Sequence, residues 1–326
     1  MAMTLASFWR SARAGAWLGW RSESNWTDPF LFALYSLVQP LARLLIPLFM
    51  YLVIARLAGG SGAGAGVAGS AGGTTTAGAA AAAGASAAGG AGVRFFDFLY
   101  TGNALFLYVG AVLSGMSWVI IEDREFYQMI RYIWIAAPSF PGYLVGRSAA
   151  KLAIATVSVS MALLVGWLWL DVPLTIPCSW FPGAQGASLP ALLFFFVLGL
   201  AASATMGLGM AGANLLSARE GGDRSEALNA TLYLFCGAAF PLDVLPGWAR
   251  PLGLLLPQTY WLEGMRRLLL PPGASFGKTL SGLDLQALLE RMAVTGAIWA
   301  VIGVGLLWLG LRAARGRGSL DQVTEH

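Results

Sequence analysis

Histidine, cysteine and paired carboxylates most often carry catalysis or bind metals, and this chain holds few of them. Its 326 residues include one histidine, His326 at the C-terminus, and two cysteines, Cys178 and Cys236. A Ser-His-Asp or Cys-His constellation needs a histidine inside the fold, and two widely separated cysteines indicate neither a disulfide framework nor a zinc site. We therefore expect no catalytic centre in this chain and no metal or cofactor bound by it.

Two carboxylate groups and one glycine-rich stretch remain as candidates. Glu122 and Asp123 are adjacent, and a second acidic group follows at positions 220–226, but arginines flank both groups, as is typical of solvated charges. Residues 272–279, PGASFGKT, nearly match the phosphate-binding pattern GxxxxGK[ST]. Proline replaces its first glycine and no apolar strand precedes it, so the strand–loop–helix cradle that this motif requires is missing. We exclude an ATP site here.

The composition is that of a protein embedded in a membrane. Hydrophobic residues make up 57% of the chain and charged residues 11%, with a mean hydropathy of +0.67, whereas soluble domains carry about 25% charged residues. The net charge of +4 follows from where Lys and Arg stand relative to the membrane and does not indicate a nucleic-acid partner. Several apolar runs approach the roughly 20 residues that span a bilayer. The fold class predicted is an all-α polytopic membrane protein.

Six spans are predicted, preceded by an interfacial segment. Residues 1–29 alternate tryptophans and arginines at helical spacing, which predicts an amphipathic helix in the membrane interface rather than a signal peptide. The six-span domain then covers residues 30–326. The predicted spans are residues 31–57, 98–121, 149–170, 189–216, 227–240 and 291–311.

The first span contains an arginine, and a low-complexity segment follows the span. Arg43 lies inside the first span, where a charge facing lipid is costly. It could face a cavity or a partner subunit and contact a substrate, or it could form a structural ion pair or snorkel to the surface. Residues 59–92 are almost entirely Gly, Ala, Ser and Thr, which predicts a flexible outer loop.

Prolines interrupt the apolar chain before the last span. Pro241, Pro246 and Pro251 follow an apolar helix at five-residue spacing, and each removes a backbone donor. Broken apolar backbone at membrane depth requires packing on protein or a cavity. Residues 241–270 are therefore predicted to form short helices that dip into the outer half of the bilayer.

The order FPLxxLPxW, LPxTY and EGxR in this segment resembles the signature of the type-2 ABC transporter permeases, the membrane halves of ATP-driven exporters. The resemblance implies a re-entrant helical hairpin on the outer side, involved in gating. The residues that would form it are Phe240, Pro241, Pro246, Trp248, Pro257 and Tyr260. The bland alternative is a proline-rich outer loop of an unrelated membrane protein.

The same resemblance assigns a role to residues 122–148, between the second and third spans. In these permeases this cytoplasmic loop begins with an acidic–basic cluster and carries a coupling helix that fits a groove of the ATPase. The matching residues here are Glu122, Arg124, Glu125, Phe126, Met129, Ile130 and Ile133. Phe126 and Tyr127 depart from the small residues usual in the family. An interfacial linker helix is the alternative.

Basic residues set the predicted orientation. Twelve Lys and Arg residues fall on the side that holds both termini and seven on the other side, so the positive-inside rule places both termini in the cytoplasm. We expect a multi-pass protein of the cytoplasmic (inner) membrane.

The resemblance implies the permease subunit of an ABC exporter, with no ATPase site of its own. A separate ATPase subunit would bind ATP–Mg, and a second permease copy or a sister permease would complete a dimer in membrane lipid. Aromatic and apolar spans favour an amphiphilic or apolar substrate of the drug, lipid, glycolipid or polysaccharide class. The alternative left open is a non-transporting integral membrane protein that acts in assembly, immunity or anchoring.

Overall fold

The computed structural model describes residues 5–24, 95–127, 139–175, 188–216, 221–271 and 278–317, and single positions 38, 42, 49, 129, 132, 133 and 135. Within these residues the protein is helical and contains no strand. The first predicted span, Arg43, residues 59–92 and the near P-loop at 272–277 lie outside the described residues, apart from positions 38, 42 and 49 in the span.

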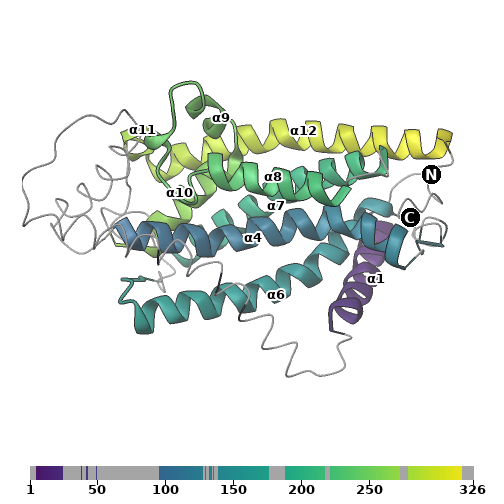
Figure 1. Ribbon diagram of the computed structural model, residues 1–326, viewed down its shortest axis with the longest axis horizontal. Helices are drawn as coiled ribbons and strands as arrows, with labels where there is room; N and C mark the ends of the chain where they lie inside the picture. Colours follow the sequence, from purple (N-terminus) through teal and green to yellow (C-terminus); the bar gives the residue numbers. More distant parts are fainter. Residues whose placement is uncertain are drawn as a thin grey trace, which may run out of the picture.

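Four long helices run side by side along the molecule (Figure 1). They are α4 (Phe95–Ile121), α6 (Phe140–Trp169), α7 (Leu189–Leu216) and α12 (Leu285–Arg317). Each contains a window with a mean hydropathy of 2.0 or 2.1 and exceeds the roughly 20 residues that cross a bilayer. The described part of the chain therefore holds four helices able to span a membrane, and the six-span layout stays a prediction.

The helix α4 is the centre of this bundle. In its most apolar window 72% of the residues are buried, compared with 22–33% in the other three long helices. Those three helices expose large apolar side chains such as Val157, Phe194 and Val301. Since a helix that is apolar all round is buried in protein or faces lipid, α4 forms the protein interior. Helices α6 and α7 pack directly on α4, and α12 packs on α7.

Glycines bring α7 and α12 into close contact. A Cβ added at Gly212 would lie 2.5 Å from the main-chain oxygen of Leu306, and one at Gly303 would lie 2.0 Å from that of Thr205. Such small residues let membrane helices approach at backbone distance. The glycines of α7 thus allow its close contact with α12.

The predicted boundaries of three spans were wrong. Helix α6 begins at Phe140 rather than at 149, so residues 140–148 of the predicted coupling loop are helical, with Ser139 as N-cap accepting from the amide of Gly142. Helix α8 (Gly221–Phe235) begins inside the stretch predicted as a charged loop. Helix α12 extends past both predicted ends. In α8 and α12 polar residues occupy the added helix ends, and an apolar window alone misses them.

The chain is broken before Pro241, because the helix predicted to reach residue 240 ends five residues earlier. Helix α8 ends at Phe235, and Gly237 then adopts a φ of +77°, the left-handed conformation that commonly follows a helix end. A short 3-10 turn, η3 (Leu242–Val244), α9 (Arg250–Leu254) and α10 (Pro257–Leu269) come next, and α11 (Lys278–Ser281) precedes α12. Prolines stand at the first turns of α9 and α10, where a missing amide donor costs nothing.

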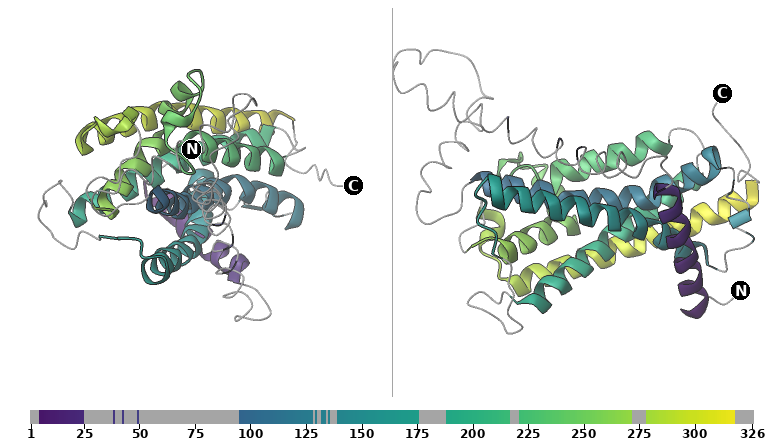
Figure 2. Two further views of the ribbon diagram at one scale, coloured as in Figure 1. Left: turned by 60° about the vertical axis from the view of Figure 1, so that its left-hand side comes forward. Right: turned by 90° about the horizontal axis from the view of Figure 1, so that it is seen from below.

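Helix α1 (Leu5–Ser24) runs across the long helices at one end of the bundle (Figure 2). It packs on α6 through glycines of both helices. A Cβ at Gly146 would lie 2.0 Å from the main-chain oxygen of Ala12, and one at Gly15 would lie 2.5 Å from that of Tyr143. The elements α9, α10 and α11 lie at the opposite end (Figure 1).

Candidate functional site

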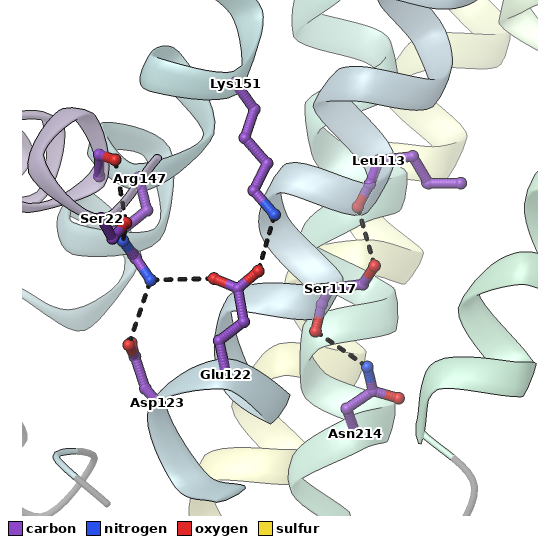
Figure 3. A network of polar contacts seen from close by, with 9 residues as sticks. Ser22, Leu113, Ser117, Glu122, Asp123, Arg147, Lys151 and Asn214 are labelled. Carbon is purple, nitrogen blue, oxygen red and sulfur yellow. Dashed lines mark hydrogen bonds and ion pairs between the residues drawn. The ribbon is translucent and has the colours of Figure 1, made fainter. Parts of the chain in front are cut away.

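A turn of π-helix, η2 (Glu122–Phe126), follows α4 directly. Such turns are rare and often mark functional positions. Figure 3 shows that the Glu122 carboxylate faces two basic side chains of α6, with Arg147 at 3.0 Å and Lys151 at 2.9 Å. Arg147 and Lys151 are four residues apart, so they lie on the same face of α6. This face binds the end of α4.

Asp123 contacts the same face of α6 and is more buried than Glu122. Its carboxylate lies 3.4 Å from Arg147 and accepts a hydrogen bond of 2.7 Å from the hydroxyl of Tyr143. The side chains of Asp123 and Arg147 are only 4% and 2% exposed. We call Glu122, Asp123, Arg147 and Lys151 the charged cluster. A buried pair of this kind is costly to break, because either partner alone is left as an uncompensated charge.

The charged cluster also holds α1. Arg147 donates a hydrogen bond to the hydroxyl of Ser22, near the end of that helix (Figure 3). Near its start, the Ser11 hydroxyl accepts a 3.0 Å bond from the amide of Ser139, the N-cap of α6. Together with the glycine contacts, these bonds make α1, α6 and the end of α4 one packed unit.

Arg124 points to the other side of the bundle. Its guanidinium donates to the main-chain oxygen of Asn214 at 3.3 Å, in the last turn of α7, where a cation also complements the helix dipole. The side-chain amide of Asn214 donates to the main-chain oxygen of Ser117 at 3.1 Å and to the hydroxyl of Ser225 at 3.4 Å. Asn214 therefore joins α7 to both α4 and α8.

The structure brings together only part of the predicted coupling site. Glu122 and Arg124 are in contact with α6 and α7, while Glu125 and Phe126 are described in their backbone only. Met129 is exposed, Ile133 is buried against α4 and α6, and Ile130 lies outside the described residues. The coupling helix itself stays a prediction, since the described residues include only isolated helical positions there.

Sequence reasoning missed the partners of this site. Arg147 and Lys151 were counted only as charges on one side of the membrane, Asp123 was placed among solvated charges, and Asn214 and Ser22 were not singled out. The four-residue spacing of Arg147 and Lys151 was the one available signal, because it places two cations on one helix face.

Arg266 organises the opposite end of the molecule. Its guanidinium donates to the main-chain oxygens of Gly237 at 2.8 Å and Ala238 at 3.1 Å, just after α8. It lies 3.7 Å from the ring centre of Phe98 on α4, in a cation–π contact. A Cβ added at Gly102 would lie 1.8 Å from this guanidinium. Arg266 thus ties α10 to α8 and α4.

The residues predicted for the outer hairpin divide into two groups. Pro241, Pro257 and Tyr260 are buried, and the Tyr260 hydroxyl donates to the main-chain oxygen of Leu254 at 2.8 Å. Pro246 and Trp248 are exposed, and Phe240 is half-buried. One part of the segment, with Pro241, Pro257 and Tyr260, therefore packs against the protein. The part with Pro246 and Trp248 is exposed.

A small pocket opens beside Arg266, lined among others by Glu263, Asp243 and Thr279. Burial alone raises the pKa of Asp243, but hydrogen bonds from Thr279 and the nearby charge of Arg250 outweigh it and hold the pKa below its ordinary value. Asp243 is therefore an ionised acceptor at neutral pH. It fastens η3 to α11.

A family model described as "ABC-2 type transporter" matches residues 16–270, which is more than half of the chain. No curated protein matches the chain. The matched range begins within α1 and ends just after α10, so it includes both the charged cluster and the segment organised by Arg266.

Proposed function

This chain belongs to the ABC-2 type transporter family, and from that premise we propose that it is the permease subunit of an ATP-driven exporter. Family membership and the apolar long helices make it a multi-pass membrane transport component without an ATPase site of its own. The substrate class, the ATPase partner, the membrane and its sidedness are part of the proposal.

One observation carries the mechanism: neighbouring side chains after α4 diverge to two different helices. Glu122 and Asp123 bind α6, whereas Arg124 binds the end of α7. A force applied to the following residues would therefore reach both helices through short polar contacts. Interior packing is bistable rather than continuously deformable, so such a force favours a rigid-body change between two arrangements.

We assign the source of that force to a separate ATPase subunit. That subunit binds ATP–Mg and presses on residues 126–137, with Glu125, Phe126, Met129, Ile130 and Ile133 as its contact region. Met129 and Tyr132 are exposed next to η2, which suits a protein contact. ATP hydrolysis in the partner then drives the helices of the permease between inward and outward arrangements.

The segment after α8 is proposed as the outer gate. A re-entrant hairpin would include the buried Pro241, Pro257 and Tyr260 and an exposed tip at Trp248. Helix α8 has 15 residues, or about 22 Å at 1.5 Å per residue, less than the roughly 30 Å hydrocarbon core. Because this fifth span is shorter than the hydrocarbon core, a hairpin can occupy the outer half of the bilayer next to its end.

Substrate passes between two permease copies, or between this chain and a sister permease, next to α4 and α8. Apolar helix surfaces with few charges fit an amphiphilic or apolar substrate of the drug, lipid, glycolipid or polysaccharide class. Arg43 is a possible pathway or interface residue. Six spans with both termini in the cytoplasm place the charged cluster on the cytoplasmic side of the inner membrane.

Purification of the tagged protein from its native membrane in mild detergent tests this proposal. The expected result is a stoichiometric ATP-binding subunit, identified by mass, and an ATPase activity that co-elutes with it. The variant Met129→Ala/Tyr132→Ala removes exposed side chains beside η2 and should release the subunit. Trp248→Ala removes an exposed aromatic side chain at the opposite end and should leave it bound.

Two results would contradict the proposal. One is a preparation that lacks any ATP-binding subunit under conditions that preserve other membrane complexes. The other is equal retention of the subunit by both variants, which would place the contact elsewhere on the chain.

A further inference from the structure

One face of helix α1 packs on α6, and the described residues leave the other face exposed. Ser11, Ala12, Gly15 and Gly19 lie on the packed face. The exposed face carries Leu5, three tryptophans at positions 9, 17 and 20, and Arg10, Arg13 and Arg21. Trp9 and Trp17 are 65% and 62% exposed. Such a surface needs a partner that is both apolar and charged.

The direction of α1 limits what this partner is. Figure 2 shows α1 running across the long helices rather than along them. Because those helices are long and apolar enough to cross a bilayer, a helix transverse to them at their end lies close to the membrane plane. Amphipathic helices in that position bury tryptophans at headgroup depth and keep basic groups among the headgroups.

Tryptophan–arginine pairs recur at this end of the molecule. The guanidinium of Arg21 lies 5.1 Å from the ring centre of Trp17 on α1, and that of Arg312 lies 5.2 Å from the ring centre of Trp308 on α12. Both pairs are four residues apart, and Trp17 and Trp308 are exposed. A guanidinium held beside a ring at headgroup depth presents its donors to phosphate oxygens in two-point fashion.

The charge of α1 selects between kinds of headgroup. Helix α1 (residues 5–24) contains three arginines and one glutamate, Glu23, so its net charge is +2. Zwitterionic headgroups carry a cation that offsets their phosphate, whereas anionic headgroups carry net negative charge. We propose that the exposed face of α1 is a binding surface for the headgroups of anionic phospholipids, with the tryptophans as anchors and the arginines as the phosphate-binding groups.

This surface does not depend on an ATPase partner, so it is tested on the full-length protein alone. The purified protein in neutral detergent is mixed with equal amounts of phosphatidylglycerol and phosphatidylcholine that share the same acyl chains. Native mass spectrometry then counts each bound lipid. We expect preferential retention of phosphatidylglycerol, with the preference reduced by 0.5 M salt, which screens exposed charges.

The variant Arg10→Gln/Arg13→Gln removes two charges from exposed side chains. At about 1 kcal/mol per basic residue near a membrane surface, the preference should fall roughly 30-fold. The matched control, Lys278→Gln/Arg291→Gln, removes two exposed charges near the opposite end and should leave the preference unchanged. Arg10→Lys/Arg13→Lys should keep most of it.

Three outcomes would overturn the inference. The wild-type protein could retain both lipids equally. The two glutamine variants could lose the preference to the same extent, which would make it an effect of net charge. Arg10→Gln/Arg13→Gln could instead keep the preference and release a co-purifying protein, which would make the face a protein contact.

Discussion

Arg147 on α6 and Glu122 at the end of α4 are joined by an ion pair of 3.0 Å, although 24 residues separate them in the chain. Arg147 is 2% exposed and also contacts Asp123 and Ser22. One guanidinium therefore connects α4, α6 and α1. Lys151, one turn further along α6, binds the same carboxylate but is 21% exposed.

This difference in burial predicts different costs for two otherwise similar substitutions. Arg147→Gln leaves Asp123 as a buried carboxylate without a cation and should lower the free energy of unfolding by about 3 kcal/mol. Lys151→Gln removes an equal charge from a partly solvated pair and should cost less than about 1 kcal/mol. Thermal or denaturant unfolding in the same detergent measures both variants. Equal losses of unfolding free energy in the two variants would show that the buried Asp123–Arg147 pair does not stabilise the contact between α4 and α6.

The contact between α1 and α6 should be sensitive to one methyl group. Gly146→Ala places a Cβ 2.0 Å from the main-chain oxygen of Ala12, so the helices must separate at a cost of about 1–3 kcal/mol. Gly305→Ala adds the same group to α12, where nothing lies within 4 Å, and should be neutral or slightly stabilising because alanine favours helix. Thermal stability of the two variants distinguishes them, and a neutral Gly146→Ala would contradict the packing described.

Arg266 should control the stability of the segment after α8. Arg266→Met removes its hydrogen bonds to the oxygens of Gly237 and Ala238, which are charge-assisted bonds. A loss of about 2 kcal/mol in local opening free energy corresponds to roughly 30-fold faster amide exchange over residues 237–256. Hydrogen–deuterium exchange measures this effect, with the exposed Lys278→Met as control.

A second variant gives an independent check on the same segment. Gly102→Ala leaves Arg266 unchanged but places a Cβ 1.8 Å from its guanidinium and 2.6 Å from the oxygen of Ala238. Exchange over residues 237–256 should therefore accelerate in this variant as well. Unchanged exchange in both variants would mean that this segment is held by its apolar contacts alone.

Composition and apolar periodicity were sufficient to predict the helical membrane class and the span at residues 189–216, which matches α7 to the residue. The prolines predicted that short helices follow the fifth span, but the helix of that span ends at Phe235 rather than at residue 240. These features follow from local rules: an apolar run long enough for the bilayer, and a missing backbone donor at each proline.

The contacts of the charged cluster could not be predicted in the same way. Glu122 and Arg124 were identified as a charged end of a span, but their partners depend on which helices pass beside them. The extension of α6 back to Phe140 placed Arg147 on the same helix as Lys151 rather than in a loop. Because Asn214 binds through its neighbours on α4 and α8, only the three-dimensional packing reveals its role.

We propose that displacement of the residues after α4 by the ATPase subunit moves α6 and α7 together. The contacts of Glu122, Asp123 and Arg124 transmit this movement. The most direct measurement uses the complex with its ATPase subunit and a nitroxide label at Thr156, which is exposed on α6. Electron–electron double resonance then gives the label-to-label distance between permease copies, with and without trapped ATP. The account predicts a change in that distance in the otherwise unsubstituted protein. In Glu122→Gln/Arg124→Gln the change should be lost while the ATPase subunit remains bound; the same change in both proteins would contradict the account.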